Sequence, residues 1–395
     1  MWIFRSGLVV AAYIGMNIYA GIRIFGFFRY FLPFFRAYVY WPLYFLFSFS
    51  YILIFLLRID RVPLLRNIAM LSLPSMVYFF LAIVLADAFR LALQIAGRLP
   101  KTSGLSVLFT GIALGIALIT VVYGSFNARQ IGVVHYKIDL GAAEADASAA
   151  APETGKSPLR MAMVSDIHIG PTVDRKWLAK VVDAINSSEP DIICLAGDIF
   201  DNNVASLREP EAFAAEFQRL KAPLGVYACQ GNHDVDRLSL RGEATTSRTK
   251  EFYRGAGVVL LEDEVVDIEG LFYLAGRRDS RPIGARQGRK TAAELTAGLD
   301  LSIPLIVLDH QPLDFAAEEA AGADLILSGH THRGQFFPGN LVTSRMYKKA
   351  GAVHYGYWRG STAQAVVSSG AGVWGPPLRV ATWSEVAVIE ITFTP

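Results

Sequence analysis

This sequence of 395 residues has only two cysteines, a small net charge and no evident internal repeat. The net charge of +2 gives no strongly basic balance, so we expect no nucleic-acid partner. The two cysteines, Cys194 and Cys229, stand four and three residues before polar motifs that follow two neighbouring strands. If the motif ends are aligned, the two thiols point to opposite faces and cannot form a disulfide. Unpaired thiols favour a reducing cytoplasm for this part of the chain.

Apolar residues, by contrast, are abundant and unevenly spread. The chain is 53% hydrophobic and 12% aromatic, and the excess lies in its first third. Each of four apolar runs is close to the ~20 residues that cross ~30 Å of hydrocarbon as a helix. The runs cover residues 7–28, 39–57, 68–85 and 105–122. We therefore predict a multi-pass membrane protein with a four-helix transmembrane region at residues 1–125.

The apolar runs leave some alternatives open. A buried soluble bundle would show polar helix faces, and a cleaved signal peptide would explain the first run only. The basic residues that flank the runs divide evenly, so the orientation stays undecided. Asp87 and Arg90, three residues apart, form either a headgroup or proton site or an interfacial pair with Arg90 reaching toward water. Arg23 allows the same two interpretations.

Hydropathy falls after Tyr123, and a second region begins. Residues 126–158 contain a predicted strand, IGVVHYKIDL, and a flexible linker. From residue 159 to 395 short apolar strands alternate with amphipathic helices, which is typical of an α/β domain. One helix, in TVDRKWLAKVVDAINSSEPD, places a single apolar stripe on Trp177, Leu178, Val181, Val182 and Ile185.

Five predicted strands of this region end in the polar motifs SDIHIG, GDIFD, GNHD, LDHQP and GHTHRGQ. Open α/β sheets bind ligands at the carboxyl ends of their strands, so these motifs should converge. Their candidate ligands are carboxylates, an amide and imidazoles: Asp166, His168, Asp198, Asn232, His310, His330 and His332. With no cysteine among them, they suit Mn²⁺, Fe²⁺ or Zn²⁺ better than a structural zinc cage. Seven candidates fit two ions that share a bridging carboxylate.

The order of these motifs resembles that of the calcineurin-like metallophosphoesterases over about residues 159–395. The tail SSGAGVWGPPLR is similar to the membrane-associated bacterial branch of that family, which includes proteins with amino-terminal transmembrane helices. The resemblance implies an α/β fold class, a four-layer α/β/β/α metallophosphoesterase sandwich preceded here by the four-helix transmembrane region. It also implies a centre of two divalent metal ions, for which Mn²⁺ is our first choice and Fe²⁺ or Zn²⁺ the others.

The resemblance assigns a role to each matching residue. The ligands of one ion would be Asp166, His168 and His332. Those of the other would be Asn232, His310 and His330. Asp198 would bridge the two ions, while Asp201 and His233 would handle the proton of the leaving group. Asp234 stands where many members have glutamate, and Arg333, which replaces a glycine of many relatives, either binds the substrate phosphate or faces solvent.

We expect this centre to hydrolyse a phosphoester or pyrophosphate bond, with a metal-activated water as nucleophile and His233 as proton donor. The transmembrane spans favour a phosphorylated lipid or nucleotide-lipid substrate such as UDP-diacylglucosamine. We expect the protein in the cell inner membrane, with its catalytic domain in the cytoplasm. One alternative is a transporter or sensor with a non-catalytic domain, which would usually have lost a metal ligand. Another is a plain anchor for an enzyme of soluble substrates. Oligomeric state stays open.

The aromatic stretches VHYGYWRG and VWGPPLR have two interpretations. They either complete the core of the second region, or they form an apolar rim that admits acyl chains.

Overall fold

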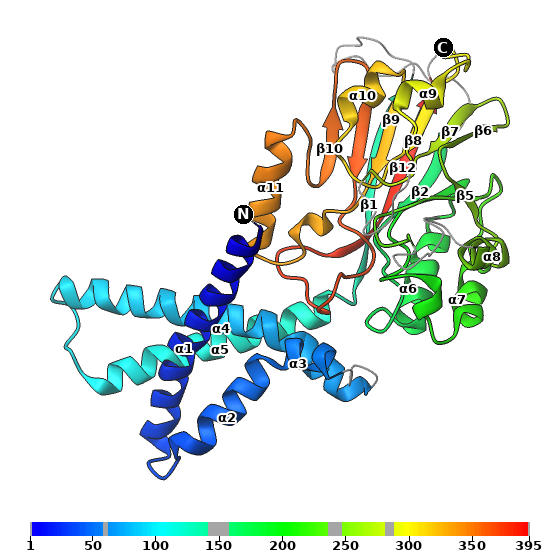
Figure 1. Ribbon diagram of the computed structural model, residues 1–395. Coiled ribbons are helices and arrows are strands. Elements are labelled where there is room, and N and C mark those ends of the chain that lie inside the picture. The colour runs from blue at the N-terminus through cyan, green and yellow to red at the C-terminus, as the bar shows by residue number, and fades with distance from the viewer. Residues whose placement is uncertain (1, 58–61, 141–157, 236–246, 281–287, 394–395) are drawn as a thin grey trace. The chain divides into compact units, whose positions relative to one another are not determined.

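The computed structural model describes most of the chain, in five segments that form two compact units (Figure 1). The described segments are residues 2–57, 62–140, 158–235, 247–280 and 288–393. The first unit contains Met1–Phe126 and Gly375–Leu378, and the second contains Asn127–Trp374 and Arg379–Pro395.

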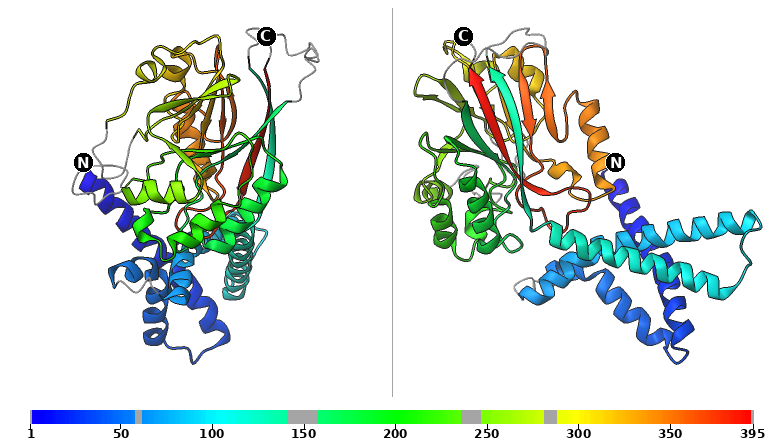
Figure 2. Two further views of the ribbon diagram at one scale, coloured as in Figure 1. Left: turned by 90° about the vertical axis from the view of Figure 1, so that its right-hand side faces the viewer. Right: turned by 180° about the vertical axis from the view of Figure 1, so that it is seen from behind.

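The described part of the first unit is helical. Its elements are α1 (Trp2–Phe31), α2 (Ala37–Ser48), α3 (Ser50–Leu56), α4 (Pro63–Ile95) and α5 (Ser103–Asn127). Helix α1 packs across α4 (Figure 1, Figure 2). A small apolar core of its own joins four of these helices, with Ala20, Tyr44, Ile83 and Ala113 as members.

Three of these helices are long and apolar enough to cross a membrane: Val10–Phe31, Leu64–Ile95 and Ser103–Asn127. The second predicted span folds instead as two helices, α2 and α3, which are bent by 66° at a break. The described residues thus give three candidate spans, or four if the bent pair counts as one. The apolar run alone could not reveal the bend, because apolarity does not specify backbone angles.

The described strands of the second unit form two six-stranded sheets. The first has the order β1 (Ile131–Leu140), β12 (Ser384–Phe393), β2 (Leu159–Val164), β3 (Ile192–Ala196), β4 (Val226–Cys229) and β5 (Val259–Leu261). Strand β12 is antiparallel to β2, and the other neighbours in this sheet are parallel.

The second sheet has the order β10 (Gly356–Arg359), β11 (Gln364–Val367), β9 (Leu325–Ser328), β8 (Leu305–Leu308), β7 (Phe272–Gly276) and β6 (Glu264–Ile268). Strands β11, β9, β8 and β7 are parallel, and an antiparallel strand closes each edge. Strands that end in the predicted motifs therefore occur in both sheets, and not in one open sheet.

Each sheet is apolar on both faces. One core lies between the two sheets and includes Met163 of β2 and Leu308 of β8. The outer face of the first sheet packs against α6 (Arg175–Ser187), α7 (Pro210–Phe217) and α8 (Ser247–Gly255). The outer face of the second packs against α9 (Ala292–Thr296) and α10 (Phe315–Ala320), while α11 (Gly339–Lys349) adds Tyr347. This arrangement confirms the predicted α/β class.

Helix α6 shows how local sequence specifies one of these elements. Asp174 caps its first turn, since the carboxylate accepts a hydrogen bond of 3.0 Å from the main-chain N–H of Trp177. The buried face consists of Trp177, Leu178, Val181, Val182 and Ile185, which confirms the predicted stripe. These side chains cover the first sheet and belong to its outer core.

Strand β1 belongs to the first sheet, although the sequence analysis placed it before the domain that was expected to begin at residue 159. It pairs in parallel with β12 from Ile131 opposite Ser384 to Leu140 opposite Phe393. Ile138 and Leu140 are 1% exposed in the core between the sheets. The predicted linker after this strand, residues 141–157, lies outside the described residues.

The two cysteines point to the same face of the first sheet, so the expectation of opposite faces is wrong. Strands β3 and β4 align Ala196 with Cys229, which places both thiols in the core between the sheets. The register differs by one residue from the motif-based alignment, and a shift of one residue reverses the side of every side chain. Both cysteines are nonetheless free and buried, and burial raises the pKa of each thiol.

Candidate metal centre

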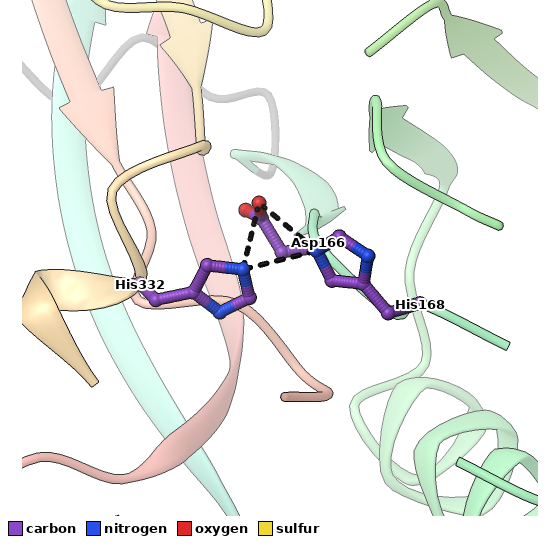
Figure 3. A group of neighbouring side chains, drawn as sticks. All are labelled: Asp166, His168 and His332. Carbon is purple, nitrogen blue, oxygen red and sulfur yellow. Dashed lines mark hydrogen bonds and ion pairs between the residues drawn. The ribbon is translucent and has the colours of Figure 1, made fainter. Parts of the chain in front are cut away.

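The predicted polar motifs converge where the carboxyl ends of strands from both sheets meet. Asp166 and His168 follow β2, Asp198 follows β3, and the GNHD motif follows β4. His310 follows β8, and the GHTH motif follows β9. Figure 3 shows Asp166, His168 and His332 turned toward one another from these two directions. Side chains 164 residues apart in sequence thereby become neighbours.

Backbone strain concentrates at this point. Asp166, His168, Asp198, His330 and His332 all have positive φ, between 47° and 69°. This left-handed region is unfavourable for residues other than glycine and persists only where surrounding contacts impose it. Here the N–H groups of Asp166 and His168 donate hydrogen bonds of 3.0 Å to the carbonyls of Gly197 and Asp198. The turns hold the side chains at the junction of the sheets.

Glycines beside the motifs allow the turns to approach one another. A Cβ atom on Gly231 would lie 2.2 Å from the main-chain nitrogen of Asp198. A Cβ atom on Gly329 would lie 2.3 Å from a carboxylate oxygen of Asp166. Both positions directly precede a candidate ligand, so any larger residue would push that ligand away.

One cluster of ligand atoms comes from Asp166, His168 and His332. The Nε2 atoms of the two histidines are 3.0 Å apart, and His332 Nε2 lies 3.4 Å from Asp166 Oδ1. The three groups can hold a metal ion together. Burial lowers the pKa of His168 to about 3 and that of His332 well below its ordinary value, so both rings are neutral, as metal binding requires.

A second cluster comes from Asp198, His310 and His330. His310 Nδ1 donates to the carbonyl of Ala196 at 2.8 Å, which directs Nε2 toward Asp198 Oδ2 at 3.1 Å. The neighbouring carboxylate of Asp198 outweighs burial and raises the pKa of His310 well above its ordinary value. Asn232 is 6% exposed, and its side-chain oxygen is buried with no hydrogen-bond partner among the described residues. A buried amide oxygen without a partner is costly, and a cation would satisfy it.

Asp198 faces both clusters. Its Oδ2 lies 3.6 Å from His168 Nε2 and 3.1 Å from His310 Nε2, while Oδ1 accepts a hydrogen bond of 2.8 Å from the N–H of His233. Burial raises the pKa of this carboxyl, but the charge and the hydrogen bond of His310 outweigh burial and hold the pKa below its ordinary range. The carboxylate is therefore charged and placed to contact ions in both clusters.

His233 lies beside the first cluster, near Asp201, and its Nδ1 has a main-chain partner. That atom donates to the main-chain carbonyl of Asp201 at 2.7 Å, whereas the carboxylate of Asp201 lies 4.0 Å from His168 Nδ1. The main-chain bond fixes the Nδ1–H tautomer of His233. Its Nε2 is the ring nitrogen that does not contact this carbonyl.

Asp234 connects two of the motif turns. Its carboxylate accepts hydrogen bonds from the main-chain N–H groups of Phe200 at 2.9 Å and Gly231 at 2.8 Å. The aspartate side chain is long enough to reach both turns. Although many relatives have glutamate here, Asp234 still links the motifs that follow β3 and β4.

Comparison with known proteins identifies the fold family. Residues 159–334 match the model of the family described as calcineurin-like phosphoesterase. A protein of Aquifex aeolicus named as an uncharacterized metallophosphoesterase is 30% identical over 253 residues, which cover 60% of this chain and 88% of that protein. The chain belongs to the calcineurin-like phosphoesterase family. It is a metal-dependent phosphoester hydrolase by this membership, and its clusters of aspartate and histidine could hold metal ions.

Two further relatives extend the likeness beyond the catalytic unit. A metallophosphoesterase of Campylobacter jejuni is 26% identical over 368 residues, covering 88% of this chain and 89% of that protein. A protein of Danio rerio named as a transmembrane protein with metallophosphoesterase domain is 31% identical over 290 residues. That match covers 71% of this chain, which spans 62% of the length of the relative. Together with the apolar helices, these matches indicate membrane association of this calcineurin-like phosphoesterase.

Arg333, in the phosphoesterase GHTHR segment, is held by aromatic rings. Its guanidinium carbon lies 4.2 Å from the ring centre of Tyr355 and 4.3 Å from that of Trp383. The Tyr355 hydroxyl and the Trp383 N–H each donate to Glu385 at 3.0 Å, so the two rings are themselves fixed. One terminal nitrogen of Arg333 is buried without a partner among the described residues, which leaves a donor for an anion.

Arg379 is a site residue that the sequence analysis missed. Its side chain is 0% exposed and donates to the carbonyls of Ser369 at 2.6 Å and Gly372 at 2.7 Å, with His332 O at 3.4 Å. It thus ties the turn that carries His332 to the glycine-rich segment after β11. The sequence signal for this role was an arginine at the end of the glycine-rich segment SSGAGVWGPPLR. A charged side chain in an otherwise apolar and glycine-rich segment is buried only if acceptors surround it.

The two aromatic stretches have different outcomes. Trp358 packs on Phe315 with ring centres 4.9 Å apart and joins the outer core of the second sheet. Trp374 is 57% exposed, and its ring centre lies 6.3 Å from that of His233. Gln335 fixes the main chain of Trp374 with hydrogen bonds of 2.9 and 3.1 Å. Trp358 therefore completes a core, whereas Trp374 stands at the rim of the metal centre.

Proposed function

We propose that the chain is a membrane-bound hydrolase that uses two divalent metal ions to cleave a phosphoester or pyrophosphate bond of a phosphorylated lipid or nucleotide-lipid. The observation that carries the proposal is the pair of ligand clusters, with Asp198 facing histidines of both and the unpartnered side-chain oxygen of Asn232. UDP-diacylglucosamine is our specific substrate candidate, Mn²⁺ our first metal, and the cytoplasm our location for the catalytic unit.

The donor set supports a division of ligands between two ions. Asp166, His168 and His332 would hold one, and Asn232, His310 and His330 the other. Asp198 would bridge them, because its carboxylate faces histidines of both clusters. When bound, such ions offset charge on the phosphoryl group and lower the pKa of a water so that it can attack phosphorus.

The chain's own residues supply the remaining steps. His233 Nε2 would donate a proton to the departing oxygen, and the carbonyl of Asp201 would keep the ring oriented through Nδ1. Arg333 would bind a non-bridging phosphate oxygen, since its aromatic partners hold it while one of its nitrogens lacks an acceptor. Trp374 would exclude water from the leaving-group side.

Support for a lipid-linked substrate comes from two features. An exposed tryptophan beside the proton donor gives an apolar surface on which an acyl chain or a base could lie. Helices long enough to span a membrane would keep the enzyme where lipid substrates are. A soluble phosphodiester would need neither feature.

The first test is metal content and turnover of the purified full-length protein beside Asp198→Asn. We expect about two ions per chain and hydrolysis of a chromogenic phosphodiester. Loss of the bridging charge should reduce turnover ~10³-fold, equivalent to about 4 kcal/mol. Asp183→Asn, an exposed aspartate on α6, is the matched control and should keep both properties. A protein that binds metal but hydrolyses no phosphoester would instead support the transporter or sensor alternative.

The second test separates lipid from soluble substrates by Trp374→Ala. Turnover of UDP-diacylglucosamine in detergent should fall about tenfold, equivalent to about 1.4 kcal/mol of lost apolar contact. Turnover of the chromogenic diester should stay within about twofold, because the metal ligands are unchanged. Equal losses on both substrates would argue against an apolar rim, and Trp358→Ala, which opens a core, should instead lower stability.

A further inference from the structure

Charged side chains gather within the apolar first unit where α1 packs across α4. Arg23 Nη2 lies 2.6 Å from Asp87 Oδ1, and the hydroxyl of Tyr19 donates to Asp87 Oδ2 at 2.6 Å. Arg90 Nη2 lies farther away, 3.4 Å from Asp87 Oδ1. The same Arg23 nitrogen also donates to two hydroxyls of α5, at 2.9 and 3.2 Å. The polar cluster comprises Tyr19, Arg23, Asp87, Arg90, Ser106 and Thr110.

The polar cluster has a net charge of +1. It contains two guanidinium groups and one carboxylate, and the Nε atoms of both arginines are buried without a partner among the described residues. An unbalanced charge among apolar helices is unfavourable, so such residues usually have a partner. Both arginine side chains remain about one fifth exposed, at 22% and 21%, so that a ligand can reach them.

An apolar groove begins at the same place. It lies between α1 and α4, has a volume of about 800 Å³ and includes Tyr19, Met16, Phe80 and Val84 in its walls. This volume is within the range of small-ligand sites, ~300–1,000 Å³. Tyr19 belongs to both features: its ring lines the groove, while its hydroxyl contacts Asp87 in the polar cluster.

We propose that the first unit binds one anionic phospholipid, with the phosphodiester at Arg23 and Arg90 and an acyl chain in the groove. The single excess positive charge matches the single negative charge of a phosphodiester. The apolar groove that continues from Tyr19 selects a lipid over a free anion. Asp87 orients Arg23 and keeps the site from attracting a more highly charged group. This site differs from the catalytic centre and holds whether or not the substrate is a lipid.

Native mass spectrometry of the full-length protein in detergent tests the proposal. The probes are phosphatidylglycerol, phosphatidylcholine with the same acyl chains, and inorganic phosphate. We expect one phosphatidylglycerol per chain, retained at least about tenfold better than phosphatidylcholine. Excess inorganic phosphate should not displace it. Displacement by phosphate, or equal retention of the two lipids, would overturn the proposal.

Variants separate a specific site from general adsorption of lipid. Arg90→Gln should reduce retention of phosphatidylglycerol about tenfold, and Arg90→Lys should restore part of it. Val84→Trp should fill the groove and reduce retention of both lipids. The matched control Arg98→Gln removes an exposed arginine of the same unit and should have no effect. Unchanged retention in Arg90→Gln would contradict the proposal. Hydrolysis of the soluble diester should be unaffected in every variant, which reports that the catalytic unit has folded, and the partial recovery in Arg90→Lys reports that the first unit is intact.

Discussion

At the scale of single residues, Arg379 contacts the turn that carries His332 although no motif of the sequence indicated this role. It contacts carbonyls of two segments in a site where it is fully buried, and burial lowers its pKa to about 10. The guanidinium remains charged at neutral pH and adds positive charge beneath the turn that carries His332. We regard it as a positioning residue, since it would act through His332, a proposed metal ligand.

Arg379→Lys should leave the fold intact but loosen the turn that carries His332. A lysine ammonium cannot reach Ser369, Gly372 and His332 together, because it lacks the planar fork of arginine. We expect metal affinity and turnover each to fall about 10- to 100-fold. Metal titration followed by activity at saturating metal measures this, and saturating metal should restore part of the activity. Arg254→Lys, an exposed arginine on α8, is the control. Full activity of Arg379→Lys at limiting metal would contradict the positioning role.

At the scale of elements, the proposed metal centre depends on short turns supported by helices and strands that the local sequence specifies. Helix α6 is one such support, because its apolar stripe packs on the sheet whose strands end in three of the motifs. Trp177 also donates from its ring N–H to the carbonyl of Ala371 at 3.1 Å, in the glycine-rich segment near the centre. The first turn of α6 therefore affects both the stability of the second unit and the position of the glycine-rich segment near the proposed metal centre.

Asp174→Ala should destabilise the second unit by about 1 kcal/mol, because the first turn of α6 loses its cap. For a unit of this size the thermal midpoint should fall by about 2–4 °C. Scanning calorimetry of the full-length protein in detergent would measure the change. Asp183→Ala removes an exposed aspartate of the same helix, whose ion pair with Arg219 contributes little, and should shift the midpoint by less. Equal shifts would show that the cap is not a stabilising contact.

At the scale of the whole molecule, the catalytic unit starts earlier than its motifs. Strand β1 precedes the first motif by more than twenty residues, yet it pairs with β12 along its whole length. Its side chains Ile138 and Leu140 lie in the core that both sheets share. The unit that carries the proposed metal centre therefore begins at Asn127.

A chain that begins at Asn127 should be more stable than one that begins at Leu159. The shorter chain loses two fully buried aliphatic side chains, each worth about 1.5–3 kcal/mol, and exposes an edge of β12. We expect a lower thermal midpoint by circular dichroism and aggregation on warming. Ile138→Ala in the longer chain should cost about 2–5 kcal/mol, whereas Val133→Ala, which is exposed on the same strand, should cost little. Equal stability of the two chains would mean that β1 adds nothing to the fold.

The sequence by itself determined the elements and the chemistry of this protein. The stripe of α6 follows from a 3.6-residue period, and the apolar runs of the first unit follow from length and composition, because these properties are local. The types of the candidate ligands could also be predicted from the sequence, because aspartate, asparagine and histidine that follow several apolar strands are typical of a metal site. Their order along the chain led to the family.

Only the tertiary structure decided which of these residues meet and on which side they lie. A register shift of one residue placed Cys194 and Cys229 on the same face, and a backbone bend divided the second apolar run between α2 and α3. The different surroundings of Trp358 and Trp374 and the acceptors of Arg379 likewise come from segments distant in sequence. These outcomes depend on packing between elements, which local periodicity does not encode.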